Sequence, residues 1–316
     1  MNLKKLHDTE LYCGIDTIQI ESVSEPKDLQ PLPIFITASP LFNKRQNTYY
    51  YRLNPDKANG KSIYNGTDYF DTLEHMLTKA NFDSPVKTRI DFRFDSLDEN
   101  YNELLKLNKL LLSLIAIEFD LKNKYESRDF LELRHLCIRI QNNEIEVENY
   151  DKSIQEPTGY VKNRIEFRTK QISKNIPEKC KERKEFKEWC KRLDKAVSAK
   201  NFDELTKRLN TALIEVYNEE KTRKGFSLAK FLYKYEDCIF SHNQLKELFA
   251  EIGTFKDAAK QATEHKKRNY VEYFSLADIK RYVKKIKSSG NRFFGIENDV
   301  KKGQICTEMK KIKQCV

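Results

Sequence analysis

Three short stretches of this sequence place acidic, basic and phenolic side chains on alternate residues. The stretches 87–94 (KTRIDFRF), 144–150 (EIEVENY) and 163–169 (NRIEFRT) each alternate apolar with polar residues, which predicts half-buried strands. Residues of one parity in a strand point to the same face of its sheet. If the three strands share a sheet, one face is apolar and the other collects carboxylates, arginines and a tyrosine.

The polar parity of these strands contains the groups of a metal-assisted phosphoryl-transfer site. Asp91 and Asp95 lie in the first strand and Glu166 in the third. Tyr150 ends the second strand, and Lys152 follows two residues later. Carboxylates bind hard divalent cations, a cation neutralises charge on a phosphate, and nearby cations favour the tyrosinate form of a nucleophilic tyrosine. The competing interpretation is a charged face that is simply solvated, as in most half-buried antiparallel sheets.

These motifs, in this order, resemble the rolling-circle replication initiators of small Gram-positive plasmids, the Rep_trans type. The resemblance depends on TRIDFRFD (88–95), on the triplet Tyr150-Asp-Lys with Glu156 nearby, and on RIEFR (164–168). The stretch YRLNPDK (51–57) is similar to a segment that precedes the first motif in that family. The likeness extends over about residues 48–170 and ends there.

The resemblance implies a metal-dependent, site-specific DNA nickase and strand transferase. Tyr150 would attack one strand at the origin of a plasmid or mobile element and become joined to the 5′ phosphate, leaving a 3′ hydroxyl that primes replication. Asp91 and Glu166 would hold Mg²⁺ or Mn²⁺, with Asp95 in the same shell, and Lys152 would lie beside the scissile phosphate. The arginines of the same strands would contact DNA or support the site: Arg89, Arg93, Arg164 and Arg168.

The implied partners are origin DNA, both double- and single-stranded, a host helicase, a replicative polymerase and a second copy of the chain. Two other functions fit the same residues. A conjugative relaxase of an integrative element would use the same chemistry, and a non-catalytic, sequence-specific DNA-binding protein would have a merely solvated acidic face.

Other residues offer alternatives within the site. Tyr125 and Tyr160 are possible nucleophiles in predicted loops. The aromatic run 49–51 fits sheet packing better than a stacking platform for single-stranded DNA. Asp16, a polar residue in an apolar stretch, fits a turn or edge position better than a further acidic ligand.

The elements that must position these residues indicate an α+β fold with an antiparallel-dominated sheet. Helices would cover one face, and the active site would lie on the other. A leucine stripe with helical spacing at 100–117 predicts one covering helix. Alternation and turn residues predict further strands at 13–20, 33–38, 48–53 and 131–140, and helical spacing predicts helices at 71–80, 179–200, 203–219 and 275–289. Ser241 with Gln244 predicts a helix start, and Gly290 suits a helix end.

The net charge of +10 is unevenly distributed along the chain. Residues 1–170 contain 24 Lys and Arg against 27 Asp and Glu, a balance of −3, whereas residues 171–316 contain 34 against 21, a balance of +13. This asymmetry predicts a nicking domain at 1–172 and a helical basic domain at 173–316 that binds DNA or a partner.

Helix 275–289 has an apolar stripe on one side and cationic side chains on the other. The cations of that helix in the predicted DNA-binding set are Lys280, Arg281, Lys284 and Lys285. Lysine-rich helices suit phosphate contact better than base readout. The competing interpretation is the solvated side of an ordinary amphipathic helix.

The sequence lacks the motifs of several classes of protein. No apolar run approaches the roughly 18 residues of a membrane span, and the start of the chain lacks the apolar core of a secretory signal. The seven cysteines and five histidines lack zinc-site spacing, and no Gly-x-x-x-x-Gly-Lys-Ser/Thr loop occurs. We therefore expect a cytoplasmic protein with reduced thiols, no organic cofactor and no membrane partner.

Overall fold

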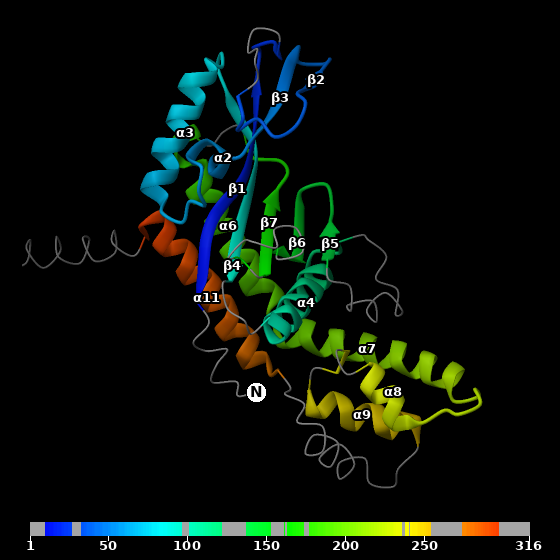
Figure 1. The fold of residues 1–316 in the computed structure, drawn as a ribbon. Coiled ribbons are helices and arrows are strands. Elements are labelled where there is room, and N and C mark those ends of the chain that lie inside the picture. Colours follow the sequence, from blue (N-terminus) through cyan, green and yellow to red (C-terminus); the bar gives the residue numbers. More distant parts are fainter. Residues whose placement is uncertain are drawn as a thin grey trace, which may run out of the picture.

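The computed structural model describes residues 10–26, 33–96, 101–121, 137–152, 161, 163–173, 177–235, 238–239, 241–253 and 274–296. Within these ranges, seven strands form one curled antiparallel sheet in the order β2-β3-β1-β4-β7-β6-β5 (Figure 1). The strands are β1 (Leu11–Ser22), β2 (Leu41–Asn43), β3 (Thr48–Leu53), β4 (Val86–Ser96), β5 (Cys137–Gln141), β6 (Ile145–Asp151) and β7 (Asn163–Thr169). The predicted mixture of helices with an antiparallel sheet is confirmed.

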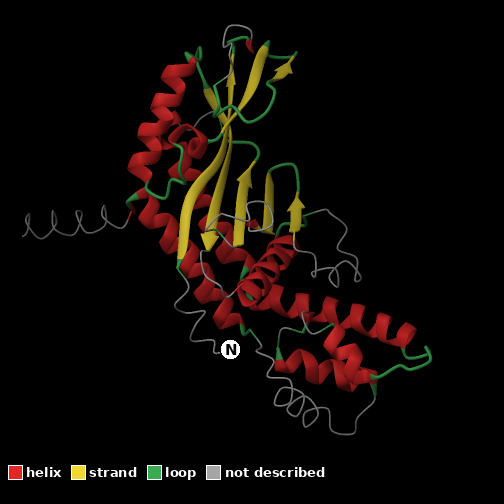
Figure 2. Cartoon of the chain, in the orientation of Figure 1, coloured by secondary structure: helices red, strands yellow, loops and turns green. Residues whose placement is uncertain are grey.

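The two longest strands, β1 and β4, form the centre of the sheet (Figure 2). The pair β2 and β3 extends one end of β1, where Ile18 pairs with Leu53. The strands β7, β6 and β5 extend the other half of β4, beginning where Ile90 pairs with Thr169. The sheet is therefore staggered, and the strands that carry the predicted site residues are neighbours.

Some helices pack against the sheet, and others project beyond it. They are α2 (Pro55–Asn59), α3 (Gly66–Ala80), α4 (Tyr101–Glu118), α6 (Lys181–Ala196), α7 (Ala199–Glu220), α8 (Leu228–Lys234), α9 (His242–Ile252) and α11 (Leu276–Phe294), with a 3₁₀ turn η3 (Glu178–Cys180). Helices α7, α8 and α9 project beyond the lower end of the sheet in Figure 1. None of the helices in the described ranges is long and apolar enough to cross a membrane.

The apolar residues of the three alternating strands belong to the hydrophobic core of the molecule. The apolar residues of the three alternating strands are all 2 % exposed or less: Ile90, Phe92, Phe94, Ile145, Val147, Ile165 and Phe167. Helices α3, α4, α6 and α11 cover this apolar face. Phe186 of α6 packs edge-on against Phe92 at 6.0 Å between ring centroids, and the Trp189 ring packs at a tilt against Phe167 at 4.9 Å.

Helices from both halves of the chain therefore share one hydrophobic core with the sheet. Phe294 at the end of α11 packs edge-on against Phe92 of β4, with ring centroids 6.2 Å apart. Ser289 of the same helix donates a hydrogen bond to the carbonyl of Leu11 at 2.7 Å. The boundary at 172/173 stays a prediction about domains, but α6 and α11 lie beyond it in sequence and cover the sheet.

Local sequence signals begin and end the helices. At the start of α11, Ser275 and Asp278 form a capping box, in which each side chain accepts a hydrogen bond from the other's backbone N–H. At the start of α9, the Ser241 side chain accepts from the backbone N–H of Gln244 at 3.0 Å, as predicted. Helix α11 ends at Gly295, whose φ of 65° is the left-handed conformation that glycine adopts freely.

Two sequence-based expectations about these elements are wrong. Gly290 does not end α11, which continues to Phe294. It instead faces Phe186, where a Cβ atom would lie only 2.0 Å from the ring. The strand predicted at 33–38 does not form, since Ile36 makes only an isolated bridge with Leu53. The Ile36 N–H instead donates to the Pro33 carbonyl at 2.9 Å, which closes a turn.

Candidate active site

The pairing of β4, β7 and β6 brings the predicted site residues together on the polar face of the sheet. Across β4 and β7 the pairs are Asp91 with Arg168, Arg93 with Glu166, and Asp95 with Arg164. On β6, the residues that continue these three rows are Glu146, Glu148 and Tyr150. Side chains from three distant parts of the sequence thus become neighbours in one ion-paired surface.

This polar face is buried rather than solvated. The side chains at its centre, Arg93, Asp95, Glu166 and Asp91, are between 0 and 2 % exposed. Buried charges are retained in proteins only when they are paired and hydrogen-bonded. The interpretation of a merely solvated charged face is therefore wrong for these residues.

Tyr150 and Glu166 form a direct hydrogen-bonded pair. The Tyr150 Oη atom donates to Glu166 Oε1 at 2.5 Å, and the two residues are 8 % and 1 % exposed. Burial and the negative charge of Glu166 raise the pKa of Tyr150 far above its usual value. The expectation that nearby cations favour tyrosinate is wrong here, because Arg164 lowers this pKa by less than the other two causes raise it.

The carboxyl group of Glu166 has a raised pKa. Burial raises the pKa of Glu166 to about 7, and the negative charge of Asp16 adds to this, against the opposing effect of Arg168 and Arg164. Glu166 therefore accepts the hydroxyl hydrogen of Tyr150 and has a pKa near neutral pH.

Arg168 lies at the centre of the acidic residues. Its guanidinium donates to Glu166 Oε2, with Arg168 Nη2 at 2.5 Å and Nε at 3.1 Å. It also contacts Glu148 at 2.5 Å, Glu146 at shorter range, and Asp91 through Nε to Oδ2 at 3.5 Å. One arginine therefore neutralises part of the charge on four carboxylates.

Arg164 has a similar role in the row that contains Tyr150, two rows from Arg168. It donates to Asp95 at 2.6 and 3.0 Å and to Asp16 at 2.7 Å. Asp95 also accepts a hydrogen bond from the hydroxyl of Tyr64 at 2.9 Å. Burial opposes ionisation of Asp16, but Arg164 and Arg93 outweigh it and lower the pKa of this carboxyl.

Asp16 was not expected on this face. It lies at a β-bulge between Ile15 and Thr17 of β1, a central strand, so the expected turn or edge position is wrong. The extra residue of a bulge changes the direction in which a side chain points. The Asp16 side chain extends past β4 and binds Arg164 of β7. An acidic residue in an apolar stretch was the only sequence signal of this role.

Arg93 is fully buried by groups that sequence patterns do not predict. Asp56 of α2 accepts from its guanidinium at 3.1 Å and at a second, shorter contact, and the Ile63 carbonyl accepts at 3.3 Å. Gly14 of β1 leaves the room for this guanidinium, since a Cβ there would lie 2.7 Å from both Arg93 Nε and the Ile63 oxygen. The segment that follows α2 thus covers the polar face beside Tyr64.

Lys152 lies next to the proposed nucleophile. Its Nζ atom is 5.9 Å from the centroid of the Tyr150 ring, and its charge contributes to the lowered pKa of Asp16. That Lys152 lies beside a scissile phosphate stays a prediction.

The carboxylates of the predicted metal site are engaged by arginines. Asp91 accepts two hydrogen bonds from Arg89, both at 2.7 Å, while Asp95 is bound by Arg164 and Glu166 by Arg168. Within the described ranges, no three histidine, cysteine, aspartate or glutamate side chains converge as a group that could hold a metal ion. In this arrangement the donor set does not fit Mg²⁺ or Mn²⁺, because each carboxylate already has a cationic partner.

Other sequence-based alternatives lie elsewhere. In the aromatic run 49–51, Tyr51 is fully buried and stacks on Phe82 at 4.8 Å between ring centroids, as expected for sheet packing. Tyr125, Tyr160 and Glu156 fall outside the described residues.

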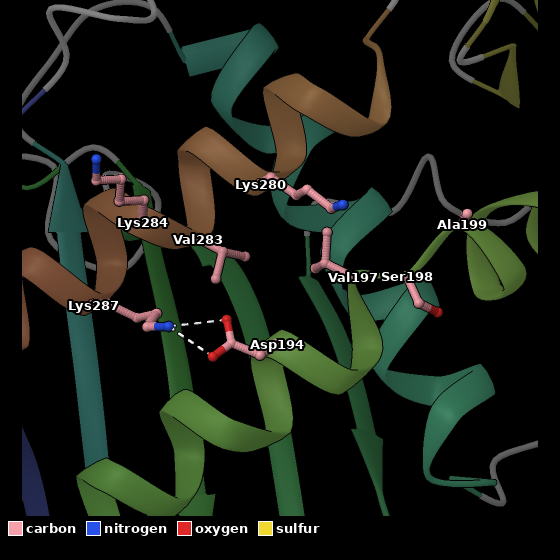
Figure 3. Close-up of a pocket in the computed structure, with 8 residues that line it drawn as sticks. All are labelled: Asp194, Val197, Ser198, Ala199, Lys280, Val283, Lys284 and Lys287. Carbon is pink, nitrogen blue, oxygen red and sulfur yellow. Dashed lines mark hydrogen bonds and ion pairs between the residues drawn. The ribbon is translucent and has the colours of Figure 1, made fainter.

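The basic helix lies on the opposite side of the sheet from Tyr150. Lys280, Lys284 and Lys287 of α11 line a groove of about 530 Å³ against Val197 and Ser198 at the start of α7 (Figure 3). Lys287 is ion-paired with Asp194 of α6 at 2.8 Å, whereas Lys280 and Lys284 are exposed.

The remaining cations of α11 are placed differently. Arg281 is exposed and forms an ion pair with Asp278 at 3.2 Å, and Lys285 is half-buried. Of the predicted cations of α11, Lys280 and Lys284 line the groove, together with Lys287.

Comparison with known proteins gives one weak structural similarity. No family model and no curated protein match the sequence. A solved structure of a rolling circle replication initiator protein from Geobacillus stearothermophilus matches with 14 % sequence identity and a TM-score of 0.24, over 51 % of this chain and 75 % of that one. A TM-score this low carries no argument about function, so the proposals below depend on this chain's own residues.

Proposed function

We propose that this protein nicks one strand of DNA through Tyr150 and thereby initiates replication of a plasmid or mobile element. The observation that supports the proposal is the Tyr150–Glu166 hydrogen bond of 2.5 Å on a face lined with arginines. A nucleophile in contact with its base, beside fixed cations, is the arrangement that attack on a phosphodiester requires. The sequence motifs that resemble replication initiators contribute these same residues.

The proposed step exchanges one ester for another. Tyr150 Oη attacks the phosphorus atom while its proton moves to Glu166, so that no free tyrosinate has to form before the attack. The bond between phosphorus and the 3′ oxygen breaks, and that oxygen takes a proton from water. The products are a 3′ hydroxyl and a 5′-phosphotyrosine, and this ester allows the same site to rejoin ends without ATP.

The cations around Tyr150 would bind the phosphate that it attacks. Arg164 lies directly opposite Tyr150 in the register of β6 and β7, and Lys152 lies over its ring. Guanidinium groups bind phosphate oxygens with two parallel hydrogen bonds, and they stabilise the charge that develops in the transition state. No step is assigned to a metal ion, because the carboxylates as placed do not present a site for one.

A nicking assay with the Tyr150→Phe variant tests the proposal. Supercoiled DNA of the element that encodes this chain is incubated with protein and Mg²⁺, Mn²⁺ or EDTA, and nicked circles and 5′-linked protein are measured. We expect Tyr150→Phe to lose both products while DNA affinity is retained. The matched control is Tyr50→Phe, a half-exposed tyrosine of β3, which should nick like the wild type.

Two outcomes would contradict the proposal. Nicking that persists in Tyr150→Phe would mean that another group is the nucleophile. Sequence-specific DNA binding by the wild type without any nicking would favour the non-catalytic alternative.

A further inference from the structure

Exposed apolar side chains gather at the end of the sheet that β2 and β3 form. Five large apolar side chains are strongly exposed in the described part of the chain, and four of them lie between residues 23 and 42: Val23, Ile34, Leu41 and Phe42. Figure 1 shows β2 and β3 at the upper end of the sheet, beyond β7, β6 and β5. Large exposed apolar patches mark interaction sites, so this end is a candidate binding surface outside the polar face.

Phe42 is the outer member of a row of four aromatic rings. Ring centroids are 4.9 Å apart between Phe42 and Tyr49, 6.4 Å between Tyr49 and Tyr51, and 4.8 Å between Tyr51 and Phe82. Tyr51 is 0 % exposed and Phe82 is 9 % exposed, whereas Phe42 is 48 % exposed. The inner rings anchor the row in the core, and the ring of Phe42 carries it out to solvent.

Strand geometry separates Phe42 from its neighbour Leu41. Phe42 pairs with Tyr49 across β2 and β3, so both side chains point to the same face as Tyr51, two residues further along β3. Leu41 precedes Phe42 in β2 and points to the opposite face. The two exposed apolar side chains of this short strand therefore lie on different faces, and Phe42 is the aromatic one.

Two cations lie in the turn that joins β2 to β3. Lys44 and Arg45 follow Asn43, the last residue of β2, and both side chains are exposed. Neither forms an ion pair with another described residue. The backbone N–H of Arg45 donates to the Asn43 side chain at 3.1 Å, which stabilises the turn. The turn thus presents positive charge two and three residues from the exposed ring.

An aromatic ring beside positive charge matches the chemistry of single-stranded nucleic acid. Single strands are bound by rings on which their bases stack and by cations that follow their phosphates. An apolar peptide would leave Lys44 and Arg45 unused, and a second copy of the chain would bring the same two cations against them. Addition of an extended strand to β2 is disfavoured, because this edge strand has three residues.

We propose that the hairpin of β2 and β3 binds single-stranded DNA, with a base stacked on Phe42 and neighbouring phosphates on Lys44 and Arg45. The hairpin joins β1 at Ser22, which pairs with Tyr49. The row of the sheet that contains Tyr150 crosses β1 ten residues earlier, at residue 12. At about 3.3 Å per residue, the two places are about 33 Å apart along the strand.

This distance makes the inference independent of the proposed function. Stacking on the hairpin requires no cleavage at Tyr150 and none of the carboxylates of the polar face. Within the proposed function, the hairpin would hold a separated strand away from the phosphate that reacts.

The fluorescence of an introduced indole tests the contact directly. The chain has one tryptophan, Trp189, which is 1 % exposed, and the wild-type protein measures its background signal. In Phe42→Trp, a base that stacks on the introduced indole should quench its fluorescence as a thymidine oligonucleotide of about 12 nucleotides is added. The matched control is Leu41→Trp, one residue away on the opposite face, which should keep most of its fluorescence.

The affinity for the same oligonucleotide, measured by fluorescence anisotropy, separates stacking from plain apolar contact. Phe42→Ala should bind about 5- to 150-fold more weakly, the usual effect of losing one stack between a base and an aromatic ring. Phe42→Leu should be weakened almost as much, because it keeps apolar bulk without a ring. Phe42→Tyr and Leu41→Ala should bind like the wild type.

The salt dependence of binding tests the cations of the turn. Each phosphate contact with a single strand contributes about −0.7 to the slope of log affinity against log salt concentration. The double variant Lys44→Gln/Arg45→Gln should therefore make the slope shallower by up to about 1.4. The matched control is Lys207→Gln/Lys230→Gln, which removes two exposed lysines of α7 and α8 and should keep the wild-type slope.

Circular dichroism establishes whether each variant folds. If Phe42→Ala does not fold, the quenching in Phe42→Trp and the slope of the turn variant decide the question, because these changes keep a ring at position 42.

Three results would overturn the inference. They are unchanged fluorescence of Phe42→Trp at oligonucleotide concentrations that saturate the anisotropy, equal affinities of Phe42→Ala and Leu41→Ala, and wild-type affinity in Phe42→Leu. Quenching that persists while Tyr150→Phe still nicks DNA would remove the proposed nucleophile and leave the hairpin site. Conversely, nicking that depends on Tyr150 without any quenching would leave the proposed function and remove only this inference.

Discussion

The two cationic regions of this molecule use different side chains in different surroundings. On the polar face of the sheet, Arg93, Arg164 and Arg168 are 0, 4 and 12 % exposed and are bound to carboxylates. In the groove between α11 and α7, exposed lysines line a surface with one ion pair, between Lys287 and Asp194. The first region holds fixed charge inside the protein, and the second presents charge to solvent.

This difference indicates two kinds of contact with a polyanion. A planar guanidinium in a buried, hydrogen-bonded position has a defined orientation, which suits a reacting phosphate. A flexible lysine at the surface interacts as a point charge and suits the phosphate backbone wherever it passes. If the groove binds DNA, as the predicted role of its lysines implies, that segment of DNA lies on the opposite side of the sheet from Tyr150.

The prediction with the largest expected effect concerns the nicking rate and Glu166, on the polar face of the sheet. Burial raises its pKa to about 7, and a base accepts a proton only when it is ionised. Nicking should therefore rise as the pH increases toward 7 and level off above it. In Glu166→Gln we expect the rate to fall by about 10²- to 10⁴-fold, the usual contribution of a general base, and the residual rate to lose this pH dependence.

The measurement is the single-turnover nicking rate between pH 5 and 9. The matched control is Glu144→Gln, an exposed glutamate before β6, which should keep the wild-type profile. A Glu166→Gln variant with the wild-type rate and profile would show that the proton of Tyr150 goes to another group.

Much of this site follows from strand alternation. The parity of β4, β6 and β7 correctly separates the apolar residues from those that meet on the polar face, and it places Tyr150 with Glu166. Alternation gives the face of a residue but not its partners, because these depend on register. That Arg168 lies opposite Asp91, and not one row away, follows only from the pairing of β4 with β7.

The remaining features depend on tertiary contacts without a local signature. Asp56 and Tyr64 reach the polar face because the segment around α2 folds over β1, and nothing in their neighbouring residues specifies that contact. Gly290 has the sequence features of a helix end, yet its role is close approach to Phe186. The raised pKa of Tyr150 is likewise a consequence of burial, which the number of nearby arginines does not reveal.

A smaller effect tests whether the arginines of the polar face are fixed in position. In Gly14→Ala, the new Cβ would lie 2.7 Å from Arg93 Nε and from the Ile63 oxygen, so the guanidinium or the covering segment must move. We expect a loss of about 1–3 kcal/mol in the free energy of unfolding, typical of overpacking, and a larger loss in Gly14→Val. Urea unfolding measures both, and an unchanged midpoint would mean that Arg93 is free to shift.

The smallest effect concerns the groove. Each phosphate contact contributes about −0.9 to the slope of log affinity against log salt concentration on duplex DNA. The double variant Lys280→Gln/Lys284→Gln should therefore make that slope shallower by up to about 2, as measured by fluorescence anisotropy with a mixed-sequence duplex. Asp194→Asn should have the opposite effect on affinity, because it removes a negative charge and releases Lys287.

The control for the groove is the double variant Lys207→Gln/Lys230→Gln, which removes two exposed lysines of α7 and α8 that do not line it. If both double variants change the slope equally, the effect comes from net charge and the groove has no special role. If only the groove variant does, duplex DNA passes between α11 and α7. In that case Arg168→Gln should leave the slope of this contact nearly unchanged, since the groove and the arginines of the polar face lie on opposite sides of the sheet.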